Sequence, residues 1–227
     1  MNQYSILKRL SAALVGASLM GAISLKASPV TVAEVGIGAN ETVYIDSSSL
    51  GNNQHVYAGV VDLLVNGIAT NGFCIDPWHW SVSGNLPYTM ESLDLAPKPP
   101  GPMGPAAALQ IEQLWAQFYS PSISNIVAAA MQIEIWQIVD AAVSGGTFHL
   151  DSVDHDSVAV YAELATMASF LSSANGSTAV ADLVAVSSGT GPGQDYVIQR
   201  VPDAGATVAL LGLGLLGILG FRKKLRA

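Results

Sequence analysis

Apolar residues in the first half of the chain follow the short, dense pattern that is typical of β-strands. Residues 42–46 (TVYID) and 56–65 (VYAGVVDLLV) are rich in β-branched and aromatic side chains, which favour strands. Asn66-Gly67 follows the second run directly, and this dipeptide indicates a tight hairpin turn. The next run, IATNGFCID at 68–76, is therefore predicted to be the returning strand.

The returning strand carries Cys74, the single cysteine of the chain. We expect Cys74 near the end of that strand, because Pro77 lies just beyond it and stops strand pairing. Asn71-Gly72 predicts a bulge or turn before the cysteine.

The second half of the chain changes to helical spacing after a proline-rich stretch at 96–105 (APKPPGPMGP), which predicts a surface loop. Pro105 begins the first predicted helix and Ser124 is the N-cap of the second. Strands followed by helices and then strands predict an α+β fold, with antiparallel strands flanking a central three-helix segment. The predicted helices are 105–119, 124–143 and 154–172, and the late strands are 179–186 and 195–201. The third helix has an apolar face made of Val158, Tyr161, Leu164, Ala165, Ala168 and Leu171.

A helical projection at about 100° per residue separates the glutamines of the first two helices. In the second helix Glu134 faces solvent, whereas Gln132 lies on the apolar face. Burying an unpaired amide costs about 1–3 kcal/mol, so the fold must satisfy Gln132 or react with it. A hydrogen bond to a strand or loop backbone remains the simpler interpretation. The first helix has a solvent-facing stripe made of Gln110, Gln113 and Gln117.

The N-terminus has the pattern of a secretory signal peptide over residues 1–27. Lys8 and Arg9 precede an apolar run at 10–25, and small residues follow. Cleavage is expected near Ala27, with Ser24 as the alternative, and an uncleaved membrane anchor is the competing interpretation.

The C-terminus combines a break at 201–205 (VPDAG), an apolar run and a basic end. Residues 204–221 approach the roughly 20 apolar residues that span a bilayer, and they have no polar face that would suit a buried core helix. Basic residues that follow a span stay in the cytoplasm, so this helix holds the domain outside the inner membrane. The basic residues are Arg222, Lys223, Lys224 and Arg226.

This three-part tail, residues 201–227, resembles the PEP-CTERM class of sorting signals in its Val-Pro-Asp-x-Gly variant. The resemblance implies that an exosortase-type membrane protease recognises and removes the tail after anchoring. The protein would then reach the cell surface or an extracellular matrix. The matching residues are Val201, Pro202, Asp203 and Gly205.

The exported domain, residues 28–200, is strongly acidic. Between Ser28 and Gly205 lie all 17 acidic residues of the chain, against two basic residues, Lys98 and Arg200. Such a charge balance repels nucleic acid and anionic lipid surfaces, so we expect no nucleic-acid partner, and solubility alone explains it most simply.

The GFCID strand end and the helix AAAMQIEIWQIVD together resemble the Cys-Gln thioester domains of bacterial surface proteins. The similarity covers about 56–148. Glu134 departs from the family pattern, which often has Ala there, and its predicted solvent-facing position leaves the bond open. The matching positions are Phe73, Cys74, Ile75, Asp76, Leu114, Trp115, Tyr119, Ala129, Ala130, Gln132, Ile133, Ile135 and Trp136.

The resemblance implies that Cys74 attacks the amide of Gln132, ammonia leaves, and a thioester joins strand to helix. An amine on a partner then opens the bond, which makes the domain a single-use covalent binder and not a turnover enzyme. His79 is a candidate proton relay, and Asp76 ties down the turn before Pro77. We expect neither a cofactor nor a metal. Aromatic residues that shield the bond, or that simply pack the core, are Phe73, Trp78, Trp80 and Trp136.

Three other interpretations remain. The first is a structural surface or extracellular-matrix protein of the same fold without a thioester, in which Cys74 is a small buried apolar residue. The second is a cysteine hydrolase with Cys74 as nucleophile and His79, His149 or His155 as base. The third is a metal site in HLDSVDHD, which lacks the glycine and terminal glutamate of a calcium loop. Its candidate ligands are His149, Asp151, Asp154, His155 and Asp156.

Overall fold

The computed structural model describes residues 27–47, 51–98, 101–144, 148–154 and 157–200. Nearly all of the predicted signal peptide lies outside these residues. The predicted sorting signal at 201–227 lies outside them too, with its helix at 204–221.

Strands in the described part of the chain form one antiparallel sheet that closes on itself. Its order is β2-β3-β7-β6-β4-β1-β5, and β1 also pairs with β2. The first six strands of this order therefore make a barrel, and β5 extends it along the C-terminal half of β1. The strands are β1 (Ser28–Ser47), β2 (Gly51–Val65), β3 (Ile68–Cys74), β4 (Leu86–Glu91), β5 (His149–Val153), β6 (Leu183–Ser187) and β7 (Tyr196–Gln199).

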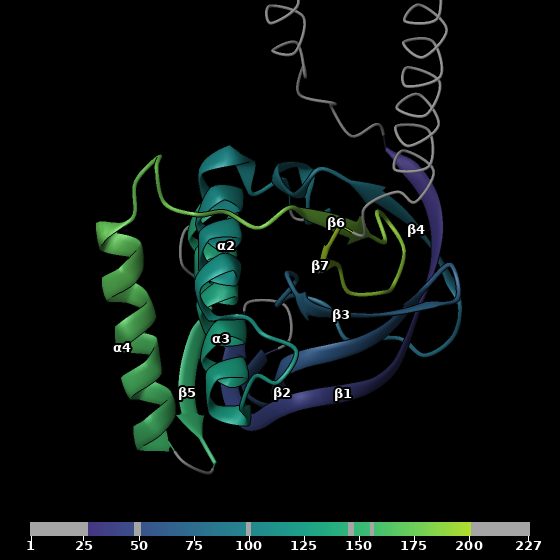
Figure 1. Ribbon diagram of the computed structural model, residues 1–227. Helices are drawn as coiled ribbons and strands as arrows, with labels where there is room; N and C mark the ends of the chain where they lie inside the picture. The colour runs from purple at the N-terminus through teal and green to yellow at the C-terminus, as the bar shows by residue number, and fades with distance from the viewer. Residues whose placement is uncertain (1–26, 48–50, 99–100, 145–147, 155–156, 201–227) are drawn as a thin grey trace, which may run out of the picture.

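The helices lie together on one side of the barrel, as Figure 1 shows. They are α2 (Gly104–Phe118), α3 (Asn125–Val143) and α4 (Ser157–Ser173), and a short 3-10 helix, η2 (Leu93–Leu95), precedes them. The central helix α3 packs against both other helices and against β1, β2 and β3. The α+β class, the mainly antiparallel sheet and the three helices are thus confirmed, but the predicted three-helix segment is interrupted by β5, which lies between α3 and α4 in the chain.

Helix α3 is the core helix of the domain. Its predicted N-cap is confirmed, because the Ser124 hydroxyl accepts a hydrogen bond from the N–H of Val127 at 3.3 Å. Among the described helices it has the length and apolarity to cross a membrane, but 67% of its apolar window is buried inside the domain. Burial on nearly all sides explains why its sequence is apolar nearly all round.

The Asn66-Gly67 hairpin between β2 and β3 is confirmed. Both residues have positive φ, 51° and 78° respectively, as a type I′ turn requires. The Asn66 side chain accepts a hydrogen bond from the N–H of Thr31 at 2.9 Å, which ties the hairpin to β1.

The bulge predicted at Asn71-Gly72 is wrong, because the β2–β3 register is continuous from Val65–Ile68 to Val61–Gly72. Glycine is required at position 72 by close packing. A Cβ atom there would lie 2.7 Å from the carbonyl oxygen of Val197 on the neighbouring strand β7.

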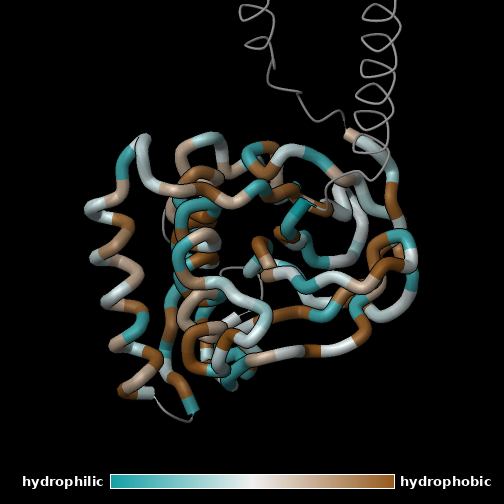
Figure 2. Tube along the Cα trace, viewed as in Figure 1, coloured by the Kyte–Doolittle hydropathy of each residue, from teal (hydrophilic) through white to brown (hydrophobic). Residues whose placement is uncertain are grey.

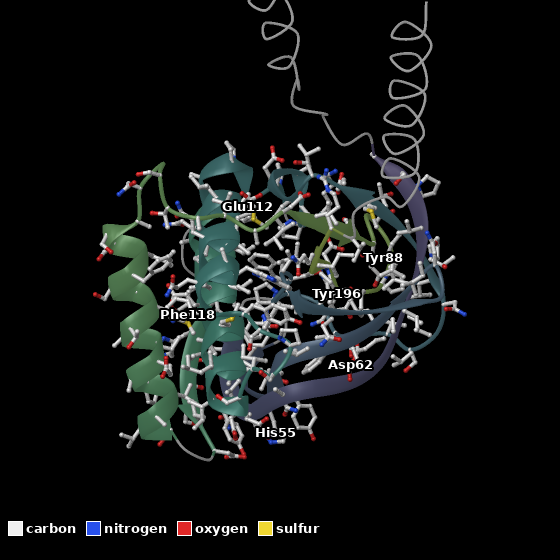
Figure 3. All side chains as sticks on the ribbon, in the orientation of Figure 1. His55, Asp62, Tyr88, Glu112, Phe118 and Tyr196 are labelled. Carbon is white, nitrogen blue, oxygen red and sulfur yellow. The ribbon has the colours of Figure 1, made fainter. Side chains whose placement is uncertain are left out.

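Helix α4 buries only part of the face predicted: Leu164 and Leu171 pack against the core, whereas Tyr161 is 44% exposed. Val158, which the sequence placed on the apolar face, is 84% exposed, whereas Val160 and Met167 are buried. Figure 2 shows hydrophobic and hydrophilic residues mixed along α4, so its pattern does not select one face. Contact with α3, and to a smaller extent with α2, instead selects it. On the α2 side Phe118, labelled in Figure 3, packs edge-on against Phe170, with ring centroids 5.5 Å apart.

Two polar residues predicted to face solvent are buried. The segment between α4 and β6 crosses α2 (Figure 1), and it covers Gln113, whose side-chain N–H donates to the carbonyl oxygen of Asn175 at 3.0 Å. Glu134 of α3 is buried beside β5 and α4, and burial raises the pKa of its carboxyl. Gln110 and Gln117 are exposed as expected.

Candidate functional site

Cys74 and Gln132, 58 positions apart in the chain, meet in the interior. The N–H of Cys74 donates to Gln132 Oε1 at 2.9 Å, and Gln132 Nε2 donates to the carbonyl oxygen of Cys74 at 2.7 Å. Cys74 is 3% exposed and Gln132 is 1% exposed. The predicted burial of Gln132 is therefore confirmed, and the exposed Gln110 does not approach the cysteine.

Divergence of the neighbouring strands explains this pairing. The last pair between β2 and β3 is Val61–Gly72, whereas β3 continues to pair with β7 as far as Cys74–Tyr196. On its β2 side Cys74 therefore has no strand partner. The amide of Gln132 supplies one donor and one acceptor there, as the backbone of an adjacent strand would.

The Cys74 sulfur lies in a tight turn formed by its own segment. The N–H of Asp76 donates to Sγ at 3.3 Å, and the thiol donates to the carbonyl oxygen of Asp76 at 3.3 Å. Burial raises the pKa of the Cys74 thiol well above its usual value, and the Asp76 carboxylate acts in the same direction. The thiol is thus neutral at physiological pH, and any nucleophilic step must remove its proton.

The buried Asp76 pairs with the half-buried His79 beside the cysteine. His79 Nδ1 lies 2.8 Å from Asp76 Oδ2, and Asp76 Oδ1 accepts a hydrogen bond from the N–H of Trp78 at 3.1 Å. Burial raises the pKa of Asp76 to about 6, opposed by the charge of His79. The predicted role of Asp76 in tying down this turn is confirmed. The relay role of His79 stays a prediction.

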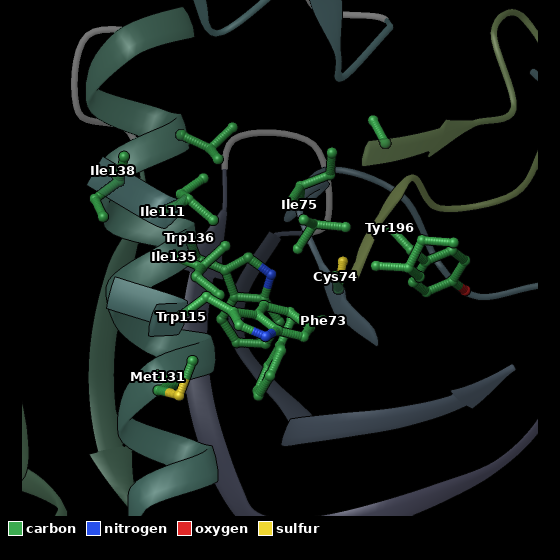
Figure 4. Packing of buried hydrophobic residues seen from close by; sticks show 14 of the residues in the cluster. Phe73, Cys74, Ile75, Ile111, Trp115, Met131, Ile135, Trp136, Ile138 and Tyr196 are labelled. Carbon is green, nitrogen blue, oxygen red and sulfur yellow. The ribbon is translucent and has the colours of Figure 1, made fainter. Parts of the chain in front are cut away.

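The aromatic residues around the site do not act as one group. Phe73 packs edge-on against Trp115 and Tyr119 of the α2 region, at centroid distances of 5.4 and 6.1 Å. Successive strand residues point to opposite faces, so Phe73 packs the core and does not cover Cys74. Trp80 is 51% exposed, and Trp136 is buried beside the cysteine (Figure 4).

A pocket of about 250 Å³ leads to this pair, and we call it the Cys74 pocket. Its buried lining residues include Cys74, Gln132 and Trp136, whereas Tyr57 and Trp80 are 57% and 51% exposed and mark its opening. Its remaining lining residues are Glu34, Ile37, Ile45, His55, Val56, Gly59, Val61, Pro77, Ser81 and Gln194.

Sequence reasoning missed the contribution of β1 and β2 to the Cys74 pocket. Glu34, His55 and Tyr57 belong to no motif, and the pairing of β1 with β2 and of β2 with β3 brings their strands beside the cysteine. Gln194 was missed too. Its side-chain N–H donates a hydrogen bond to the carbonyl oxygen of His79 at 2.6 Å.

The hydrolase and metal interpretations gain no support. Within the described residues the hydrogen-bond partner of Cys74 Sγ is the Asp76 backbone and not a histidine. No group of three or more His, Cys, Asp or Glu in the same part of the chain can hold a metal. His149 lies 3.9 Å from Asp151, and residues 155 and 156 lie outside the described ranges.

Comparison with known proteins identifies the tail. A family model of the VPDSG-CTERM motif matches residues 200–225, and this chain has Ala204 at the serine position of that motif. No curated protein and no solved structure matches the chain. The chain therefore carries a PEP-CTERM-like sorting motif, which implies processing by an exosortase-type enzyme and is consistent with export and with membrane anchoring before processing.

Proposed function

We propose that the exported domain forms an internal thioester between Cys74 and Gln132 and uses it once to attach covalently to an amine on a surface or matrix partner. The observation that carries this proposal is the paired hydrogen bonding of the Gln132 amide to Cys74 itself, at 2.9 and 2.7 Å, in a buried site. This arrangement holds the electrophile beside the residue that bears the nucleophile.

The two steps conserve atoms and protons. In the first, Sγ bonds to the Gln132 side-chain carbon, the C–N bond breaks, and the thiol proton leaves with the nitrogen as ammonia. In the second, an amine nitrogen bonds to the same carbon, the C–S bond breaks, and a proton from the amine returns to Sγ. The products are an N-substituted Gln132 amide and a free Cys74 thiol.

The backbone of Cys74 supports both steps. Its N–H already points at Gln132 Oε1, and the negative charge of a tetrahedral intermediate develops on that oxygen. Burial of both side chains limits their contact with bulk water, which would otherwise hydrolyse a thioester.

The Cys74 pocket suits an amine as the second reactant. Glu34 is the acidic residue among its described lining residues, and Tyr57 and Trp80 offer aromatic faces at the opening, all of which attract a cation. The domain's own lysine does not compete, because Lys98 is outside the lining and its Nζ is 2.6 Å from the buried carboxylate of Glu91.

Incorporation of a biotin-linked primary amine tests this function. The wild-type protein should take up one amine per chain at Gln132 and release one thiol at Cys74, as read by peptide mass spectrometry. Cys74→Ala and Gln132→Ala should take up none, and Gln110→Ala should match the wild type. Labelling that survives in Gln132→Ala would overturn the assignment of Gln132.

The alternative is a structural surface or matrix protein of the same fold without a thioester. The observation that favours it is the satisfied state of the amide, since both polar ends of Gln132 already have backbone partners. In that case the wild-type protein takes up no amine, and Cys74 carries a free thiol in every molecule.

A further inference from the structure

The indole N–H of Trp136 is a buried donor with no hydrogen-bond acceptor among the described residues. Trp136 is 4% exposed and lies one helical turn after Gln132, so both side chains are on the same face of α3. Buried donors are nearly always paired, because burial without a partner costs free energy. An unpaired N–H at this position is therefore a candidate for a functional hydrogen-bond donor.

The indole lies at the reacting sulfur. Trp136 lines the Cys74 pocket together with Cys74 and Gln132, and Figure 4 shows its ring between α3 and the cysteine. The Trp136 indole acts to lower the pKa of the Cys74 thiol, against the dominant effect of burial, although its N–H does not meet hydrogen-bond geometry with the sulfur. The N–H therefore lies near an atom that would accept it well as a thiolate.

We propose that the Trp136 Nε1–H is a catalytic donor to the Cys74 sulfur, stabilising the thiolate that attacks Gln132 and the thiolate that leaves when an amine opens the thioester. This inference rests on the proposed function. The indole itself neither gains nor loses a proton in either step. It works beside the Asp76 N–H, 3.3 Å from the sulfur, while the Cys74 N–H serves the carbonyl oxygen.

Trp115 provides a matched control. Its indole N–H is also buried without an acceptor among the described residues, and its ring packs against Phe73 and Tyr119. It does not line the Cys74 pocket. Phenylalanine at either position removes the N–H and keeps an aromatic ring in the core.

The first experiment measures the rate at which methylamine opens the thioester in the full-length protein, followed by intact mass. Trp136→Phe should slow opening by about tenfold or more, as loss of one transition-state donor does, whereas Trp115→Phe should open at the wild-type rate. Equal rates for Trp136→Phe and wild type would overturn the proposal. So would equal slowing by both variants, since that result assigns the effect to core packing.

The second experiment measures how alkylation of Cys74 by iodoacetamide depends on pH. It uses protein whose thioester has already been opened by methylamine, or untreated protein if the wild type has no thioester. The thiol pKa can therefore be measured even if the proposed function fails, and the two results stay separate. Trp136→Phe should raise the apparent thiol pKa, and Trp115→Phe should not. If Trp136→Phe does not fold, a benzothienyl analogue at position 136 replaces N–H with sulfur at constant ring size. An unchanged pKa in the variant or the analogue would contradict the donor role.

Discussion

Removal of the Gln132 side chain should strongly destabilise the domain. Gln132→Ala leaves the N–H and the carbonyl oxygen of Cys74 buried without partners, at about 1–3 kcal/mol each. The expected loss is therefore about 2–6 kcal/mol, before any cavity term, in a domain whose total stability is on the order of 5–15 kcal/mol. Cys74→Ala serves as the background, because it keeps the backbone groups and prevents a thioester.

The assay is urea unfolding followed by tryptophan fluorescence, with two matched glutamines. Gln113→Ala removes one hydrogen bond, to the carbonyl oxygen of the exposed residue Asn175, which water can then satisfy, so the loss should be about 1 kcal/mol. Gln110→Ala, on the exposed face of α2, should change stability by less than about 0.5 kcal/mol. A loss in Gln132→Ala no larger than in Gln113→Ala would refute the reasoning.

Three further predictions concern the surroundings of Cys74. Because burial raises the pKa of Asp76 to about 6, the stabilising contribution of Asp76 is present below about pH 4 and is lost as the pH rises through 6. Asp76→Asn should therefore reduce the dependence of the melting temperature on pH between pH 4 and 6. An unchanged dependence would contradict this. Gly72→Ala should cost about 1–3 kcal/mol in chemical unfolding, since its Cβ would contact the Val197 carbonyl oxygen, whereas Gly176→Ala, with open space around it, should be neutral. If His79 relays protons, His79→Gln should slow methylamine opening, and an unaltered rate would exclude the relay.

Local sequence signals predicted the elements that local chemistry determines. The Asn66-Gly67 turn, the Ser124 cap and the helical spacing of α2 and α3 each depend on neighbours within a few positions. The irregular strands were harder. β1 extends far beyond the predicted 42–46, because register shifts along it break the alternation that marks a strand. β4 (LPYTME) and β5 (HLDSV) are too polar and too poor in β-branched residues to stand out.

The need of Gln132 for a buried partner could be predicted from the sequence, but the identity and position of that partner could not. The projection of α3 correctly predicted that Gln132 is buried and needs a partner. It failed for Gln113 and Glu134, because the elements that cover them come from distant parts of the chain. That the partner is the backbone of Cys74 follows from where β2 diverges from β3, and no local pattern encodes that divergence.

The intact mass of the processed, exported protein, purified without amines or reducing agents, tests the central claim most directly. The thioester account predicts a mass lower by one ammonia than the sum of the residues between the determined termini. Methylamine should then raise the mass by one methylamine and free the Cys74 thiol. A full mass before treatment, with Cys74 alkylated completely on unfolding, would contradict the account.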